Sequence, residues 1–185
     1  MNNSISNFVR RGLAAAAFVC AAGLIAPAFA QSAPITGVPS MKDFPGALEL
    51  PDPKLDYKIV FDMNKMPASS DKVLPGLTMI GVLINTYESH GVSPDHLHLV
   101  AVFHGPTIVA VTDDATYKAR TGVDHNPNVA LLQQLRKAGL KTVVCGQSTM
   151  AQHYDFKSIQ YAQINLSASV TFINLMTRGY IKLNE

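Results

Sequence analysis

The sequence predicts an α/β protein with a mainly parallel five-stranded sheet. Short apolar runs of strand type alternate along the chain with segments whose apolar residues recur every three to four positions. Glycines follow several of the helical segments, where the chain has to turn. Strands that alternate with helices imply βαβ units, in which helices cover both faces of a parallel sheet.

The elements are predicted in chain order from these patterns. Apolar runs bounded by polar or turn residues indicate strands at 57–62, 96–104, 140–145, 161–165 and 180–183. Apolar stripes at helical spacing indicate helices at 73–90, 126–138 and 167–178, with a weaker pattern at 107–120. The candidate N-caps are Ser69, Ser70 and Asp71 for the first helix and Asn126 and Asn128 for the third.

Right-handed crossovers between these elements favour a flavodoxin-like strand order, 2-1-3-4-5, in a three-layer sandwich. In that order the strand that ends at Cys145 lies beside the first strand, which ends at Asp62. The first strand would then separate Cys145 from His104, which ends the second strand.

The N-terminal segment has the pattern of a secretory signal peptide over residues 1–30. Arg10 and Arg11 precede an apolar run, and Ala28 and Ala30 provide small residues before Gln31. The apolar run is shorter than the roughly 20 residues of a membrane span, although an uncleaved anchor is the alternative. Residues 31–56, rich in Pro, Ser and Gly, indicate an extended linker or strap, and residues 57–185 form the α/β domain.

Export to the periplasm is the first testable expectation. Intact-mass analysis of the protein from the periplasmic fraction should give a chain that begins at or near Gln31. A soluble cytoplasmic protein that keeps Met1 would contradict this prediction.

Composition excludes several classes of partner and cofactor. Removing Arg10 and Arg11 brings the 15 Lys and Arg level with the 13 Asp and Glu, so no basic patch suggests nucleic acid or an anionic membrane. We find neither a G-x-G-x-x-G fingerprint nor a P-loop, and we expect no cofactor. His96 and His98 have a spacing compatible with metal, but we expect no metal site because both faces of a parallel strand are covered.

Cys145 is the candidate reactive residue. Cys20 is removed with the signal peptide, and an unpaired cysteine in an exported protein suggests a free thiol or an intermolecular disulfide. Cys145 ends a strand, and ligand sites of open α/β sheets lie beyond the carboxyl ends of strands. The alternative is a small buried apolar residue, as most free cysteines are.

The residues around Cys145 supply candidate binding groups. Gly146, Gln147 and Ser148 are placed to open a short helix, whose backbone N–H groups could stabilise a thiolate. His153 follows within two turns, and His104 ends its strand on the same edge of the sheet.

Four short segments resemble a known family in their order and spacing. They are Lys58–Phe61, Phe103–Gly105, Val143–Gly146 and Leu175–Tyr180. Over residues 57–185 the chain resembles the DsrE/DsrF-like group, which includes the YchN-like proteins and the TusD-type sulfur-relay subunits. The resemblance implies a flavodoxin-like subunit that forms homotrimers or hexamers. In the sulfur-transfer members a cysteine at the position of Cys145 carries sulfur as a persulfide.

The function predicted from the sequence is an exported protein that binds or transfers sulfur as a persulfide on Cys145, with a sulfur donor or acceptor protein as partner. The sulfur-relay members are cytoplasmic, so their partners and modified-tRNA products do not carry over to an exported chain. The alternative is a non-enzymatic oligomeric module that binds a small ligand or a partner and tolerates Cys145→Ser.

Overall fold

The computed structural model describes residues 33–185, so the predicted signal peptide lies outside the described residues. The strands are β1 (Tyr57–Met63), β2 (Leu97–Phe103), β3 (Lys141–Cys145), β4 (Gln163–Asn165) and β5 (Ile181–Asn184). The helices are α1 (Pro75–Ser89), α2 (Asp114–Thr121), α3 (Val129–Lys137), α4 (Gly146–Ala151) and α5 (Ala168–Thr177), with 3₁₀ turns at Pro94–His96, Gly105–Val111 and Phe156–Ser158. No helix within residues 33–185 is long and apolar enough to cross a membrane.

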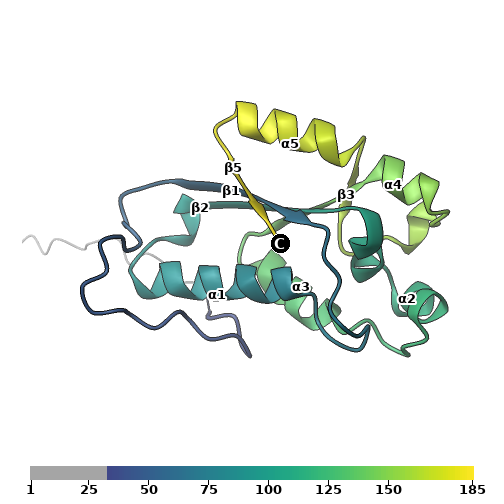
Figure 1. Ribbon diagram of the computed structural model, residues 1–185, viewed down its shortest axis with the longest axis horizontal. Coiled ribbons are helices and arrows are strands. Elements are labelled where there is room, and N and C mark those ends of the chain that lie inside the picture. The colour runs from purple at the N-terminus through teal and green to yellow at the C-terminus, as the bar shows by residue number, and fades with distance from the viewer. Residues whose placement is uncertain (1–32) are drawn as a thin grey trace, which may run out of the picture.

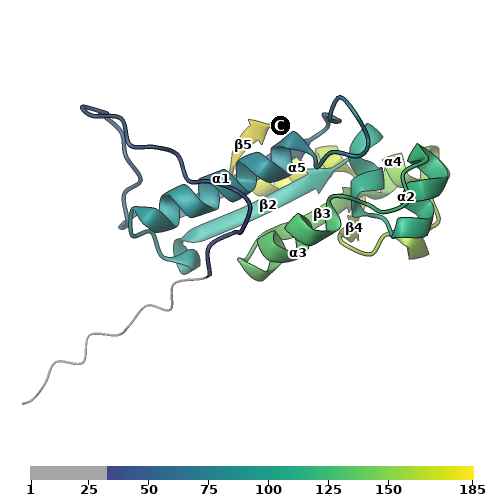
Figure 2. The ribbon, with the colours of Figure 1, turned by 90° about the horizontal axis from the view of Figure 1, so that it is seen from below.

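The five strands form one parallel sheet between two helical layers, which confirms the α/β class and the flavodoxin-like sandwich. Helices α1 and α3 lie side by side under one face, and α5 covers the other (Figures 1 and 2). The α1 side holds the larger apolar core, centred on side chains such as Phe61 and Phe103. The α5 side holds a smaller core, in which Val102 and Cys145 pack with Phe172.

The strand order is β4-β3-β2-β1-β5, so the expected order 2-1-3-4-5 is wrong. From β1 to β4 the chain always advances to the next strand in the same direction. Only the connection through α5 reverses, because it carries the chain from the β4 edge to the β5 edge. Since right-handed crossovers in opposite directions place their helices on opposite faces, α1 and α3 share one face and α5 takes the other.

The segment before β1 is held against α1 by side-chain hydrogen bonds. The Asn85 amide accepts from the backbone N–H of Ile35 at 2.8 Å and donates to the carbonyls of Ile35 and Val38 at 3.0 and 2.8 Å. Ile35 is buried, and a Cβ atom at Gly81 would come within 3.0 Å of the Val38 side chain. A glycine in α1 therefore allows this segment to pack closely on the helix.

The predicted N-caps of α1 are wrong, and Asn128 occupies the N-cap position of α3 as predicted but makes no side-chain cap hydrogen bond, because its side chain binds another loop. Helix α1 begins after Leu74, with Pro75 in its first turn and no side-chain cap. The side chain of Asn128 accepts from the backbone N–H of Leu74 at 2.8 Å. The amide of Asn126 donates to the carbonyls of Ala110 and Thr112, each at 2.9 Å. These buried asparagines thus join the loops on the carboxyl side of the sheet.

Candidate functional site

Cys145 ends β3, and His104 directly follows the neighbouring strand β2, at the carboxyl edge of the sheet. Phe103 of β2 pairs in register with Val144 of β3, so the next residues along each strand are His104 and Cys145. His104 continues the extended backbone, with φ −156° and ψ 170°. Registered residues of parallel strands project to the same face, and Cys145 belongs to the core under α5. Both side chains therefore project toward the α5 side.

The thiol of Cys145 lies at the N-termini of α4 and α5. Its sulfur accepts a hydrogen bond from the backbone N–H of Ser148 at 3.4 Å and caps α4. Burial raises the pKa of the thiol, but hydrogen bonds from Ser148 and from the backbone N–H groups of Ala168 and Gln147 outweigh it. The pKa of Cys145 is consequently lowered, although the residue is only 4 % exposed. The surroundings favour a thiolate, as helix N-termini commonly do.

Gly146 allows the chain after β4 to approach this thiol closely. A Cβ atom at Gly146 would lie 2.7 Å from the backbone oxygen of Asn165, closer than real Cβ contacts. The backbone N–H of Gln147 donates to the carbonyl of Leu166 at 3.3 Å. The connection that leads into α5 therefore packs directly on the first turn of α4.

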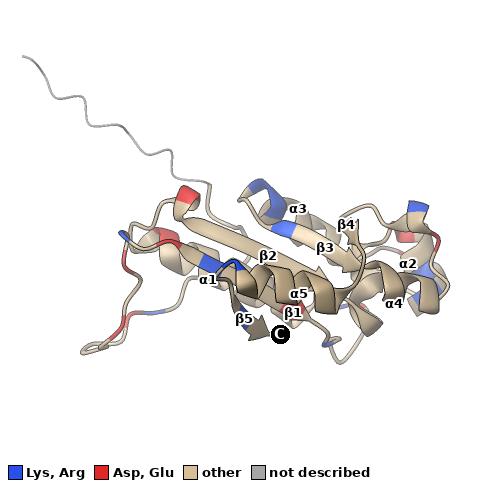
Figure 3. Ribbon diagram, turned by 90° about the horizontal axis from the view of Figure 1, so that it is seen from above, with Lys and Arg blue, Asp and Glu red and all other residues tan. Residues whose placement is uncertain are grey.

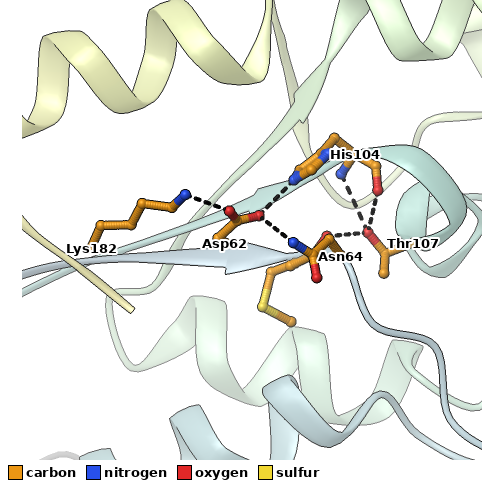
Figure 4. A network of polar contacts seen from close by, with 6 residues as sticks. Asp62, Asn64, His104, Thr107 and Lys182 are labelled. Carbon is orange, nitrogen blue, oxygen red and sulfur yellow. Dashed lines mark hydrogen bonds and ion pairs between the residues drawn. The ribbon is translucent and has the colours of Figure 1, made fainter. Parts of the chain in front are cut away.

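Beside His104, a carboxylate accepts from three nitrogen donors (Figure 4). Asp62, 6 % exposed, accepts from His104 Nε2 and from Lys182 Nζ, each at 2.6 Å, and from Asn64 Nδ2 at 3.2 Å. Burial raises the pKa of Asp62, but the contacts with Lys182 and His104 outweigh it and lower the pKa. The rings of Phe172 and His104 form a T-shaped contact with centroids 6.2 Å apart, and Lys182 Nζ lies 4.5 Å from the Phe172 centroid. Asp62 is therefore an ionised, nearly buried anchor for both groups.

The backbone of His104 is fixed by the turn that follows it. The Thr107 hydroxyl donates to the carbonyls of Met63 and His104 and accepts from the His104 backbone N–H at 3.3 Å (Figure 4). The amide of Gln152, after α4, donates to the carbonyl of Gly105 at 2.9 Å. These contacts join the ends of β1 and β2 to the segment that follows Cys145.

The structure brings together only part of the site predicted from the sequence. Gly146, Gln147 and Ser148 form the first turn of α4 beside the thiol. His104 lies on the strand next to Cys145, and β1 does not separate them as the expected order required. His153 is exposed beyond the far end of α4, about 10 Å along the helix from Cys145, with φ 55°.

Sequence reasoning missed Asp62 and Lys182 as members of this cluster. Asp62 ends the first predicted strand, and a carboxylate in a strand that is buried on both faces calls for a charged partner. Lys182 alternates with Ile181 and Leu183 in the last strand, but its nearness to Asp62 depends on β5 pairing with β1.

The described residues include no group of three or more His, Cys, Asp or Glu side chains that could hold a metal ion. His96 and His98 instead lie 3.7 and 3.5 Å from the carboxylate of Asp56. Their ion pairs are at the opposite end of β2 from His104.

Comparison with known proteins identifies the family and the fold. The model of the DsrE/DsrF-like family matches residues 57–184. The solved structure of MTH1491, a protein of unknown function from Methanobacterium thermoautotrophicum, superposes with a TM-score of 0.51 at 14 % sequence identity. The match covers 70 % of this chain and 100 % of that one, and it shows the shared fold. A search among curated proteins finds no match.

Proposed function

Because the chain belongs to the DsrE/DsrF-like family, we propose that it is an exported sulfur carrier that holds sulfur as a persulfide on Cys145. The family supports a sulfur-relay role in general. The signal-peptide pattern over residues 1–30 supports export. A partner protein would supply the sulfur or take it up.

The environment of the thiol is the observation that carries this proposal. The cysteine of a sulfur carrier attacks the donor as a thiolate, and it is again a thiolate when the sulfur has passed to the acceptor. The charged form of the cysteine therefore has to be populated near neutral pH. The backbone N–H groups of Gln147, Ser148 and Ala168 lower the pKa of Cys145 in spite of burial. The same N–H groups would stabilise the negative charge that returns to Sγ of Cys145 when the outer sulfur is transferred.

The low exposure of Cys145 limits what can reach it. A side chain that is 4 % exposed admits a small donor more readily than a folded protein surface. A persulfide would place its outer sulfur about 2 Å beyond Sγ, nearer to an acceptor. A sulfur carrier whose thiol is so little exposed therefore takes a low-molecular-mass donor or a partner with an extended cysteine-bearing segment.

One observation favours the alternative of a small-ligand module. A groove of about 440 Å³ runs between α5 and β3, and Val143, Asn165 and Thr171 are among its lining residues. Its mixed polar and apolar walls would suit a small ligand that makes no use of the thiol.

The reactivity of the wild-type protein tests the proposal. The rate of alkylation of folded Cys145 against pH should have its midpoint below 8.5, the ordinary value for cysteine, because the helix N-termini favour the thiolate. Incubation with inorganic polysulfide should add one sulfur atom per chain by intact mass, removable by reductant. A thiol that resists alkylation until the protein unfolds would overturn the proposal and favour the ligand-binding module.

We also propose that copies of the chain associate through the outer face of α5. No residue of α5 is charged (Figure 3). Val170, Ile173 and Met176 form an outward stripe with exposed fractions of 41, 63 and 50 %. Contiguous apolar surface of this kind is typical of protein interfaces.

Light scattering should therefore give the mass of a trimer or a hexamer. Ile173→Glu should lower that mass, because a charge would be buried in the interface. The matched control is Leu48→Glu, which places the same charge at a 99 % exposed leucine away from α5 and should leave the mass unchanged. A monomeric wild-type protein at micromolar concentration would contradict this assembly.

A further inference from the structure

The cluster of Asp62, His104 and Lys182 is not needed for a thiolate at Cys145, because helix N-termini already supply that stabilisation. The cluster nevertheless has short polar contacts at a nearly buried position. Two short contacts of 2.6 Å converge on one nearly buried carboxylate, and three strands contribute its members. A charged group is costly to bury, so a nearly buried carboxylate at the same edge of the sheet as the thiol requires an explanation.

The position of His104 relative to Cys145 points to proton transfer. Adjacent strands are about 4.8 Å apart, and the two residues occupy the same register step on the same face. The outer sulfur of a persulfide would lie about 2 Å beyond Sγ, which is on the α5 side of the sheet like His104. His104 has a side chain that is 26 % exposed, so it can exchange protons with solvent.

The Asp62 contact fixes the chemistry of the imidazole. Nε2 of His104 donates to the ionised Asp62 Oδ1, which orients the ring and leaves Nδ1 as the nitrogen that can exchange a proton. Lys182 neutralises the second oxygen of the same carboxylate. The titratable groups around His104 are Asp62 from β1, Lys182 from β5 on the same carboxylate, and Cys145 at the same register step of β3, while α5 presents the uncharged ring of Phe172.

We propose that His104, oriented by Asp62, protonates the outer sulfur of a Cys145 persulfide so that an acceptor thiolate can take that sulfur. This inference rests on the proposed function and names the acceptor class, a thiol. A persulfide anion repels an incoming thiolate, whereas the protonated outer sulfur is an electrophile.

The transfer balances without an added oxidant or reductant. Nδ1 of the imidazolium gives its proton to the outer sulfur, so Cys145–S–S⁻ becomes Cys145–S–SH. The acceptor thiolate R–S⁻ then forms a bond to that outer sulfur, and the Sγ–S bond breaks. Its electron pair remains on Sγ, so the products are R–S–SH and the Cys145 thiolate, which the N–H groups of α4 and α5 receive.

The test uses the full protein loaded with inorganic polysulfide, with N-acetylcysteine as the acceptor thiol. Loss of the added sulfur is followed by intact mass across pH. In the wild type the rate should pass through a maximum, because it requires an ionised acceptor and a protonated imidazole. In His104→Gln the amide can retain the contact with Asp62 but cannot carry the proton, so release should be about 100-fold slower at neutral pH and should no longer fall at alkaline pH.

His98→Gln is the matched control, since His98 lies on the same strand at its opposite end and pairs with Asp56. It should keep the wild-type rate and pH maximum. Release from His104→Gln with the wild-type rate and pH profile would overturn this inference and leave the sulfur-carrier proposal standing. Failure of the wild type to take up sulfur would instead overturn the proposed function.

A measurement on the wild type applies even if His104→Gln does not fold. With ¹⁵N-labelled histidine, sulfur loading should shift the His104 ring resonances at neutral pH and leave those of His98 unchanged. Identical His104 ring resonances in the free and loaded protein would also overturn the inference.

Discussion

Replacing Cys145 by serine is expected to abolish the uptake of sulfur from polysulfide completely. The serine hydroxyl is not ionised near neutral pH, so it cannot attack a sulfur atom as we propose for the Cys145 thiolate. The fold should survive, because residue 145 caps α4 by accepting from the Ser148 backbone N–H and serine is a preferred N-cap. Intact mass after incubation with polysulfide should therefore show an unmodified, folded chain.

Comparison of Cys145→Ala with Cys145→Ser separates the loss of the thiol from the loss of the N-cap of α4. It should lose sulfur uptake equally, but it also removes the cap and should cost about 1 kcal/mol of folding stability. Denaturant unfolding of the two variants measures that difference. Uptake of one sulfur atom by Cys145→Ser would show that another group carries the sulfur, contrary to our assignment.

Replacing Asp62 by asparagine is expected to have the largest effect on stability among these variants. It leaves Lys182 and His104 facing a neutral amide at a nearly buried position. Loss of a charged hydrogen-bond partner there should cost about 2 kcal/mol of unfolding free energy, a moderate value because Lys182 and His104 are partly exposed. Thermal unfolding should shift by about 4–8 °C. As a control, Asp124→Asn breaks the exposed pair with Lys118 and should change stability little.

The cost of Asp62→Asn should depend on pH with a definite sign. The fold lowers the pKa of Asp62, so ionisation of this carboxylate stabilises the folded state fully above the ordinary carboxyl pKa of about 4. That stabilisation is lost as the pH falls through the folded value. Denaturant unfolding of both proteins should give a constant difference at neutral pH that shrinks below about pH 4. A difference that persists in strong acid would mean that the substitution acts through packing.

The sequence predicted the elements well because their periodicity is a local property. The alternation of apolar runs and helical stripes follows from which face of each element is buried. The strand order depends on pairing between residues that are far apart in the sequence. The flavodoxin-like order 2-1-3-4-5, which was expected, is wrong. Polar residues in β4 (Gln163–Asn165) and β5 (Ile181–Asn184) indicate edge strands, whereas β2 (Leu97–Phe103) is apolar almost throughout and lies in the centre.

For the candidate site too, the local part was predictable from the sequence and the part that depends on strand order was not. Cys145 and the N–H groups that follow it come from one continuous segment, strand then glycine then helix. The cluster around Asp62 needs β5 beside β1 and β2 on the other side of β1. Lys182 could therefore be found only once the strand order was known.

Helix α5 has a second consequence because, among residues 33–185, it is the helix that covers its face of the sheet. Its inner side contributes the Ala168 N–H near the thiol and the Phe172 ring over His104 and Lys182. Its outer side carries Ile173, only one residue further along. This ten-residue helix therefore lies between the proposed interface and the thiol, so a copy bound to its outer side would be one helix away from Cys145.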